Sequence, residues 1–216
     1  MTTLKPAQFA DEELTDWVWL VRGIEARYET GGFARGLELV NRIGAAAEET
    51  GHHPDVTLTW PTVHVRLFSH DVAAITERDV AMARAISDLA RELGVTPTPE
   101  KLSRIEYALD TADKPAAIRF WAAALGYDGD ADPNEIADPD GRQTVLWFQT
   151  SDSRDEARQR FHVDVHVAPD QARPRIDAAL AAGGTLVSDG SAPSFTVIAD
   201  PDGNKVCVCT WLPPDK

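Results

Sequence analysis

The residues best suited to chemistry are three histidines, two carboxylates and the Pro and Trp between them. They follow the spacing Glu48-x3-His52-His53-Pro54-x5-Trp60-x9-His70-x8-Asp79. Imidazole titrates near neutral pH, so a cluster of such rings could donate and accept protons under physiological conditions. The two carboxylates could orient or charge the rings. The pattern therefore indicates proton-transfer chemistry, provided that the fold brings these positions together.

Periodicity in the surrounding sequence predicts the elements that must position these residues. Residues 23–30 alternate as a half-buried strand, and residues 33–49 carry apolar side chains at helical spacing, with Gly51 as a stop signal. Strands at 56–60 and 63–70 can form a hairpin that returns His70 toward the end of that helix. A second helix over 77–93, capped by Thr76, completes the pattern. We expect an α+β domain, an antiparallel sheet with helices packed on one face.

Two other interpretations fit the same histidines. They could be ordinary loop residues on a solvated surface. They could also bind zinc together with a carboxylate, although neither an H-x3-H nor a C-x2-C spacing is present to support that site.

The full spacing, together with the adjoining segments 33–43 and 69–79, resembles the pterin-4a-carbinolamine dehydratase family over roughly residues 15–92. The resemblance implies metal-free dehydration of a 4a-hydroxytetrahydropterin to quinonoid dihydropterin and water, with no cofactor required. It makes His52, His53 and His70 the catalytic set. It places Glu48, Pro54, Trp60 and Asp79 around the substrate, the carboxylates as orienting groups. It also implies a homo-oligomer. The sequence departs from the family at Pro61 and matches it only loosely over 17–23.

The rest of the chain contains an internal repeat. Residues 95–102 are rich in proline and small residues, so we expect a linker between domains at 1–94 and 103–216. Beyond it, the pentapeptide Ala-Asp-Pro-Asp-Gly occurs at 137–141 and again at 199–203. A strand and then a helix precede each copy, and a strand follows it. Two such modules in tandem predict one pseudo-twofold domain, with each pentapeptide forming a tight turn.

This repeat resembles the glyoxalase/bleomycin-resistance (vicinal oxygen chelate) superfamily. The similar segments are 104–110, 120–126, 161–165 and 200–204. The resemblance implies tandem βαβββ modules forming a cup, which in metal-dependent members holds a divalent ion. The candidate ligands here are Glu106, Gln149 (Val145 if the repeat is followed) and His162, but Cys207 replaces the last carboxylate. Because this set suits a hard cation poorly, we expect no functional metal.

Composition excludes several classes of protein. The chain of 216 residues has a formal net charge of −14, which disfavours binding to nucleic acid or to anionic membranes. It lacks a long apolar run and an N-terminal signal-like stretch. We expect Cys207 and Cys209, the only cysteines, to point to opposite faces of a strand and so not to pair, which favours the reducing cytoplasm.

We therefore expect a two-domain pterin dehydratase whose glyoxalase-like domain is an accessory. One alternative is a metal-dependent lyase, isomerase or dioxygenase in the C-terminal cup, which the cysteine at position 207 disfavours. The other is a non-catalytic small-molecule binding protein, which the intact histidine set disfavours.

Overall fold

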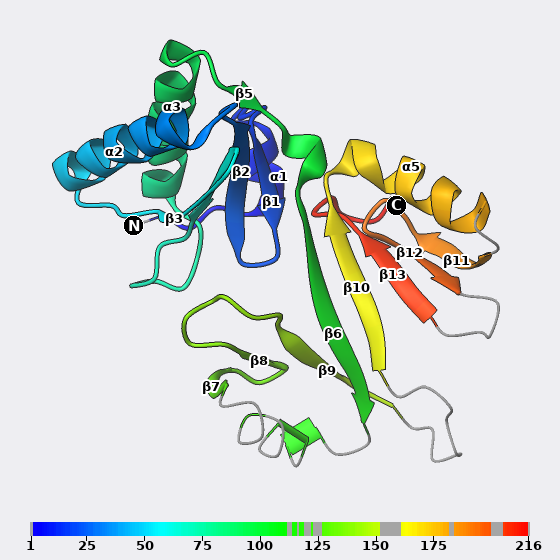
Figure 1. The fold of residues 1–216 in the computed structure, drawn as a ribbon. Coiled ribbons are helices and arrows are strands. Elements are labelled where there is room, and N and C mark those ends of the chain that lie inside the picture. Colours follow the sequence, from blue (N-terminus) through cyan, green and yellow to red (C-terminus); the bar gives the residue numbers. More distant parts are fainter. Residues whose placement is uncertain are drawn as a thin grey trace. The chain divides into compact units, whose positions relative to one another are not determined.

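The computed structural model describes residues 2–111, 114–115, 117–118, 122, 127–151, 161–181, 184–199 and 205–215 (Figure 1). The chain forms two compact units, one of Met1–Ser103 with Trp211–Pro213 and one of Arg104–Thr210 with Pro214–Lys216. No helix in the described ranges has both the length and the apolar character that crossing a bilayer requires.

The first unit is built on an antiparallel sheet. Its main strands lie in the order β1 (Trp17–Leu20), β2 (Gly23–Glu29), β4 (Thr62–Leu67) and β3 (Asp55–Thr59). Strands β3 and β4 form the expected hairpin, with Asp55 opposite Arg66 and Thr59 opposite Thr62. One side of β2 and β4 is completely buried, as period-two alternation requires, and consists of Ile24, Ala26, Tyr28, Val63, Val65 and Leu67.

Two long helices cover that buried side of the sheet. They are α2 (Phe33–Thr50) and α3 (Glu77–Glu92), and a short helix α1 (Pro6–Ala10) precedes the sheet. Leu39, Ile43 and Ala47 of α2 join the same apolar cluster as Ala83 and Ile86 of α3. The apolar stripe at helical spacing thus meets the apolar face of the sheet, which gives the α+β layers expected from the sequence.

Residues 95–102 differ from the expected linker. They include β5 (Thr96–Pro97), which pairs with β2, and the 3-10 helix η1 (Pro99–Lys101). The Thr98 amide donates to the Arg27 carbonyl at 2.8 Å, and Val95 and Leu102 are buried. Composition rich in proline predicted a linker, and these backbone bonds and apolar contacts attach the segment to the first unit.

The second unit contains the eight-stranded sheet β11-β12-β13-β10-β6-β9-β8-β7. Its strands are β6 (Ser103–Thr111), β7 (Asp128–Asp132), β8 (Glu135–Ala137), β9 (Leu146–Thr150), β10 (Phe161–Val167), β11 (Thr185–Ser191), β12 (Phe195–Ala199) and β13 (Lys205–Cys209). Strands β6 and β9 pair in parallel, as do β10 and β13. The sequence repeat therefore has a structural counterpart, because the first and last strands of each module pair in parallel.

The second module runs β10, α5 (Pro169–Ala181), β11, β12, β13 and so shows the expected βαβββ order. The first copy of the pentapeptide forms a tight turn, in which Asp138 accepts backbone bonds from Arg142 and Gln143, both at 2.9 Å. The second copy, after Ala199, and most of the helix expected over 115–125 lie outside the described residues.

Candidate functional site

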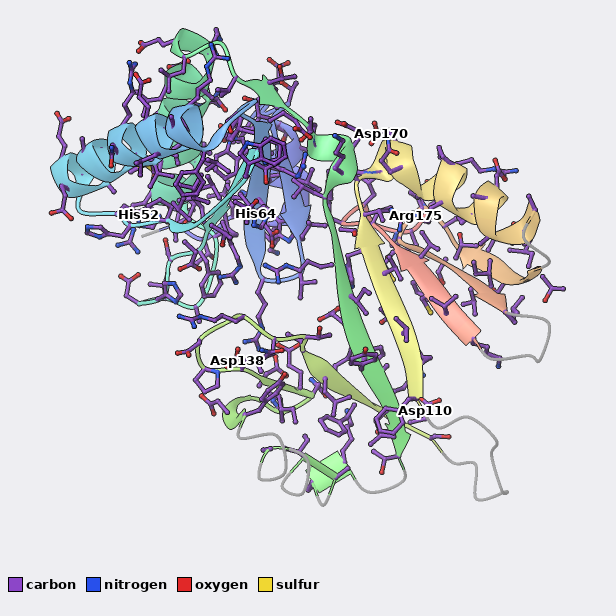
Figure 2. The ribbon with its side chains drawn as sticks, viewed as in Figure 1. His52, His64, Asp110, Asp138, Asp170 and Arg175 are labelled. Carbon is purple, nitrogen blue, oxygen red and sulfur yellow. The ribbon has the colours of Figure 1, made fainter. Side chains whose placement is uncertain are left out.

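The structure pairs His52 with Asp79. The Nε2 atom of His52 lies 2.8 Å from Oδ1 of Asp79, and both side chains are buried. His52 leaves α2 directly after Gly51, whose left-handed conformation (φ 65°) ends the helix. Asp79 lies in the first turn of α3. The end of one helix and the start of the next therefore meet at this pair, of which Figure 2 labels His52.

Asp79 also closes the N-terminus of α3. Its Oδ2 accepts from the Thr76 amide at 2.7 Å, from the Thr76 hydroxyl at 3.1 Å and from the Ser69 hydroxyl at 2.7 Å. With three donors on one oxygen, Asp79 acts as an acceptor, so we assign the contact with His52 as an Nε2–H donor bond. The ring nitrogen Nδ1 of His52 is then the one left for proton exchange.

His53 pairs with the other predicted carboxylate, and this pair is open to solvent. The Nε2 atom of His53 lies 3.0 Å from Oε1 of Glu48, and the His53 side chain is 61% exposed. Pro54 separates His53 from β3, which begins at Asp55. The two adjacent imidazoles thus have different surroundings, one buried beside Asp79 and one at the surface beside Glu48.

His70 lies in the turn after β4, next to the serine that bonds to Asp79. Its ring meets Phe68 edge-on with centroids 5.3 Å apart. Ser69 links this turn to Oδ2 of Asp79, whose other oxygen lies 2.8 Å from Nε2 of His52. The segments that carry His52 and His70 are therefore neighbours, as the hairpin expectation required.

Trp60 does not lie where its strand pattern predicted. Val56 and Leu58 pack against the core, but Trp60 is 73% exposed. Strand β3 ends at Thr59, and Trp60 and Pro61 form the hairpin turn, so the period-two rule no longer applies at position 60. A hollow of about 250 Å³ in this unit is lined by residues 13–16 with Arg84, Ser87, Asp88 and Arg91, and by none of the predicted site residues.

Sequence reasoning gave His64 no role, yet the structure gives it a buried partner. Its Nε2 lies 2.9 Å from Oε2 of Glu25, which is almost fully buried on β2. His64 and Arg66 alternate along β4 with the buried Val63, Val65 and Leu67, so they project from the side opposite the apolar core. No sequence signal joined Glu25 to His64, because the pairing of β2 with β4 sets that contact.

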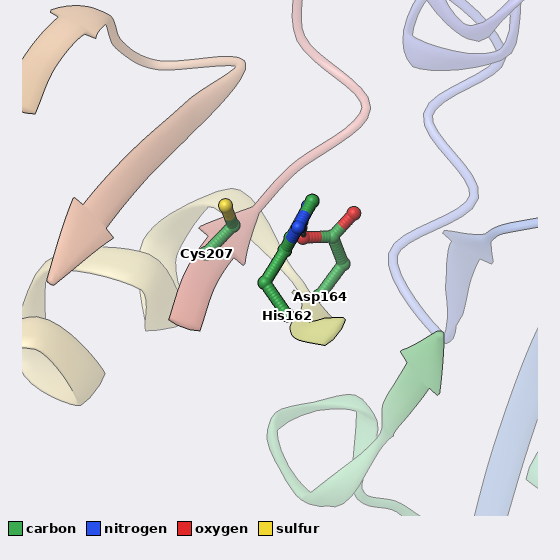
Figure 3. Close-up of side chains that lie close together, drawn as sticks. All are labelled: His162, Asp164 and Cys207. Atoms are coloured by element: carbon green, nitrogen blue, oxygen red, sulfur yellow. Dashed lines mark ion pairs between the residues drawn. The ribbon is translucent and has the colours of Figure 1, made fainter. Parts of the chain in front are cut away.

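The ligand set implied by the glyoxalase resemblance is not assembled in the second unit. His162 lies near Asp110 and Asp164, with nitrogen–oxygen distances of 3.9 and 3.5 Å, and Figure 3 shows its ring beside Asp164. Glu106 instead lies 2.7 Å from Nε2 of His166. Gln149 is exposed and in register with Asp110 on the neighbouring strand. Among the described residues, no cluster of potential ligands joins Glu106 to His162, so the hard-cation set does not fit.

The two cysteines share a face of β13, and the expectation of opposite faces was wrong. Residues two apart in a strand project to the same side, and here Cys207 lies opposite Asp164 while Cys209 lies opposite His166. Both are free thiols. Burial, then the charge of Asp164, raises the pKa of the Cys207 thiol to about 12.

Similarity to known proteins shows the family of the first unit. The described fold combines an α+β unit that contains two paired histidines with a second unit built on an eight-stranded sheet. The sequence model "Pterin 4 alpha carbinolamine dehydratase" matches residues 2–89, and "Glyoxalase-like domain" matches residues 106–209. Through its first unit the chain belongs to the pterin-4a-carbinolamine dehydratase family, and its second unit is similar in sequence to glyoxalase-like domains.

Curated relatives match the first unit over most of their own length. The "Putative pterin-4-alpha-carbinolamine dehydratase" of Nocardia farcinica (strain IFM 10152) is 38% identical over 80 residues, which is 37% of this chain and 84% of the relative. The protein of the same name from Thermomicrobium roseum is 37% identical over 79 residues, 37% of this chain and 85% of the relative.

Two solved structures are each similar to part of the chain. A transcriptional coactivator/pterin dehydratase from Brucella melitensis has a TM-score of 0.39 and 22% identity, over 41% of this chain and 99% of the other. A glyoxalase/bleomycin resistance protein/dioxygenase superfamily member from Vibrio splendidus 12B01 has a TM-score of 0.33 and 13% identity, over 50% of this chain and 99% of the other.

Proposed function

We propose that the first unit dehydrates a 4a-hydroxytetrahydropterin to quinonoid dihydropterin and water. Family membership supports this reaction class, and the observation that carries it is the pairing of two adjacent histidines with two carboxylates, His52 with Asp79 and His53 with Glu48. We propose His52, His53 and His70 as the catalytic set.

The reaction needs two proton transfers. A base removes the proton from N5 of the pterin, the nitrogen lone pair forms the C4a–N5 double bond, and the C4a–O bond breaks. An acid gives its proton to the departing hydroxyl, which leaves as water. One neutral imidazole and one imidazolium can supply both steps, and the oxidation state of the pterin changes in no step. The proposed reaction therefore requires no redox cofactor.

The carboxylates would act by fixing the rings. Where Nε2 of an imidazole donates to a carboxylate, the neutral ring keeps its lone pair on Nδ1, and the orientation of the ring is set. The buried bond to Asp79 holds His52 more firmly than the exposed bond to Glu48 holds His53. We propose that His52 is the oriented ring and that the exposed His53 and His70 contact the substrate.

Dehydration kinetics of 4a-hydroxytetrahydropterin test this proposal. His53→Ala should lower the enzymatic rate by about 100-fold or more, the usual contribution of a general acid or base. Because His53 is mostly exposed, its removal should leave the circular dichroism spectrum and thermal midpoint unchanged.

His64→Gln is the matched control. It changes a histidine of the same unit that lies outside the proposed set and retains a group able to bond to Glu25. We expect it to keep the rate of the unmodified protein. A normal rate in His53→Ala, or an equal loss in His64→Gln, would contradict the assignment.

A further inference from the structure

His70 differs from the other two histidines of the proposed set, because no carboxylate holds its ring. The rings of His52 and His53 lie 2.8 and 3.0 Å from carboxylate oxygens. Within the part of the chain that the structure describes, the His70 ring takes part in no hydrogen bond or ion pair, and the ring contact that it makes is with Phe68. A group that gives or accepts a proton in a reaction needs a defined orientation. For His70, a contact other than a hydrogen bond has to supply it.

The backbone around His70 is fixed by a short turn. Ser69 and Ala74 pair across this turn, with the Ser69 amide donating to the Ala74 carbonyl at 3.1 Å. The Ala73 amide donates to the His70 carbonyl at 3.3 Å, and the Ser69 side chain is bonded to Asp79. The Cα of His70 is therefore held in place, and only the torsions of its side chain remain to be restrained.

Phe68 supplies a restraint on those torsions. Its ring meets the ring of His70 at an interplanar angle of 87°, with the two centroids 5.3 Å apart. The charge distribution of aromatic rings favours an edge-to-face pair of this kind. Phe68 is half-buried and packs against the apolar core of the first unit. It therefore offers His70 a surface that is itself anchored.

Arg66 fixes the ring of Phe68 in turn. Its guanidinium carbon lies 5.3 Å from the centroid of the Phe68 ring, a cation–π arrangement. Nη1 of Arg66 donates to Asp55 on the neighbouring strand β3 at 3.1 Å, and the Arg66 side chain is only 13% exposed. Gly23 on β2 leaves room for this side chain, because a Cβ at position 23 would lie 2.9 Å from Nε of Arg66. Arg66, Phe68 and His70 thus form a row two positions apart, in which each side chain contacts the next.

We propose that Phe68, held by Arg66, is a positioning residue that orients the ring of His70 for proton transfer. The inference rests on the proposed function, in which His70 belongs to the catalytic set. Phe68 acts through His70 and not on the pterin, so its loss should lower the turnover number kcat without weakening substrate binding. Misplacing a reacting group by about 1 Å can reduce a rate by about 100-fold, and we expect the loss of ring orientation alone to cost about 10-fold.

Nuclear magnetic resonance (NMR) of the histidine rings in the full chain tests the orientation without reference to activity. The ring protons of His70, assigned by their absence in His70→Gln, should carry a ring-current shift from Phe68. Phe68→Leu should move these signals toward the positions of a free imidazole, whereas Phe68→Tyr should leave them near their original positions. The signals of His53, which has a different partner, should not move. Unchanged His70 signals in Phe68→Leu would overturn the proposal.

Dehydration kinetics of the same variants test the consequence for the reaction. Phe68→Leu should lower kcat by about 10-fold and change KM by less than about twofold, and Phe68→Tyr should restore kcat. Phe33→Leu is the matched control, because it removes a ring of the same unit that is 51% exposed and lies outside the proposed site. It should keep both constants. A raised KM with unchanged kcat in Phe68→Leu would place Phe68 on the substrate and overturn the positioning role.

Arg66→Gln covers the case in which Phe68→Leu fails to fold. It removes the cation from the ring of Phe68 and leaves that ring packed on the core. It should move the His70 signals and lower kcat in the same direction as Phe68→Leu, by smaller amounts, and no change in either would overturn the proposal. Absence of dehydration in the unmodified protein would contradict the proposed function, whereas the NMR comparison would still decide whether Phe68 orients His70.

Discussion

At the scale of single residues, Asp79 is the group on which most of the proposed site depends. One of its oxygens closes the first turn of α3 through Thr76 and Ser69, and the other holds His52. Its two oxygens together accept four hydrogen bonds, so the buried carboxylate has no unsatisfied oxygen. The same side chain therefore contributes both to folding and to the orientation of a proposed catalytic ring, and the two contributions can be separated by mutation.

Asp79→Asn should reduce both the stability and the dehydration rate. The asparagine side chain keeps one acceptor oxygen, but its NH2 group would face either Nε2 of His52 or the donors of Thr76 and Ser69. One buried hydrogen bond is therefore lost. We expect a loss of about 1–3 kcal/mol in the free energy of unfolding, measured in urea.

Ser69→Ala is the comparison for Asp79→Asn. It removes one donor to Oδ2 and leaves the bond to His52 in place. It should cost about 1 kcal/mol in stability with little change in rate. Equal losses of rate in the two variants would show that the orientation of His52 is not what Asp79 contributes.

The candidate site illustrates what residue types and spacing can predict. The spacing identified three histidines and two carboxylates, and the pairings of His52 with Asp79 and of His53 with Glu48 fit the expected orienting role. The expectation that Trp60 shares a strand face with Val56 and Leu58 was wrong, because strand alternation stops at the hairpin turn. Residue spacing also missed the pair formed by His64 and Glu25, since that contact depends on strand register, which no local pattern fixes.

At the scale of elements, the end of α2 sets the position of His52. Gly51 adopts φ 65°, a left-handed conformation that residues with a Cβ adopt only at a cost in free energy. Its amide donates to the Ala47 carbonyl at 2.9 Å. The helix thereby stops at Thr50 and turns the chain toward Asp79. Glycine at position 51 is therefore a requirement of the backbone.

Two glycines of the same segment should respond to alanine with opposite signs. Gly51→Ala should lower the free energy of unfolding by about 1 kcal/mol, because a Cβ is strained at positive φ. Gly44→Ala should raise it by about 0.5–1 kcal/mol, because Gly44 is helical and exposed, and nothing lies within 4 Å of an added Cβ. Urea unfolding measures both. Stabilisation by Gly51→Ala would contradict the role given to the left-handed turn.

Tyr28 should make the stability of the first unit depend on alkaline pH. Burial between the sheet and α3 raises the pKa of this phenol well above its ordinary value of 10.0, against a smaller opposite effect from Ser87. Above about pH 10 the unfolded chain loses the Tyr28 proton while the folded chain keeps it, so the free energy of unfolding should fall as pH rises.

Denaturant unfolding as a function of pH measures this effect. Tyr28→Phe should make the decrease above about pH 10 shallower. Tyr107→Phe is the matched control, since Tyr107 is 47% exposed, and it should leave the slope unchanged. The same slope in Tyr28→Phe as in the unmodified protein would contradict the assignment.

Periodicity predicted most elements to within a few residues because each has one apolar face. The helix expected over 33–49 spans Phe33–Thr50, and the helix expected over 77–93 spans Glu77–Glu92. The strand β5 escaped prediction because it has two residues and gains its stability from β2 rather than from its own pattern. Short elements made by tertiary pairing carry too little periodicity to be recognised.

At the scale of the whole molecule, the chain contains separate apolar cores. The core of the first unit joins the sheet to α2 and α3 and includes Ile43. The second unit contains one cluster with Phe148 and Ile136 and another with Val167 and Ile176. No buried residue of the first cluster belongs to the other two. Because apolar burial is the main source of stability, we expect each unit to respond to the loss of its own core side chains.

Matched truncations in the two cores should therefore act locally. Phe148 and Ile43 are each 1% exposed, so Phe148→Ala should cost about 3–5 kcal/mol and Ile43→Ala about 2–5 kcal/mol. In hydrogen exchange followed by mass spectrometry, Phe148→Ala should reduce protection in peptides from residues 104–210 and spare those from residues 2–103. Ile43→Ala should do the reverse.

Dehydration should persist in Phe148→Ala, because every residue of the proposed catalytic set lies in the first unit. Loss of protection in both units from either variant would show that they unfold as one cooperative body, and loss of dehydration in Phe148→Ala would show that the proposed site requires the glyoxalase-like unit.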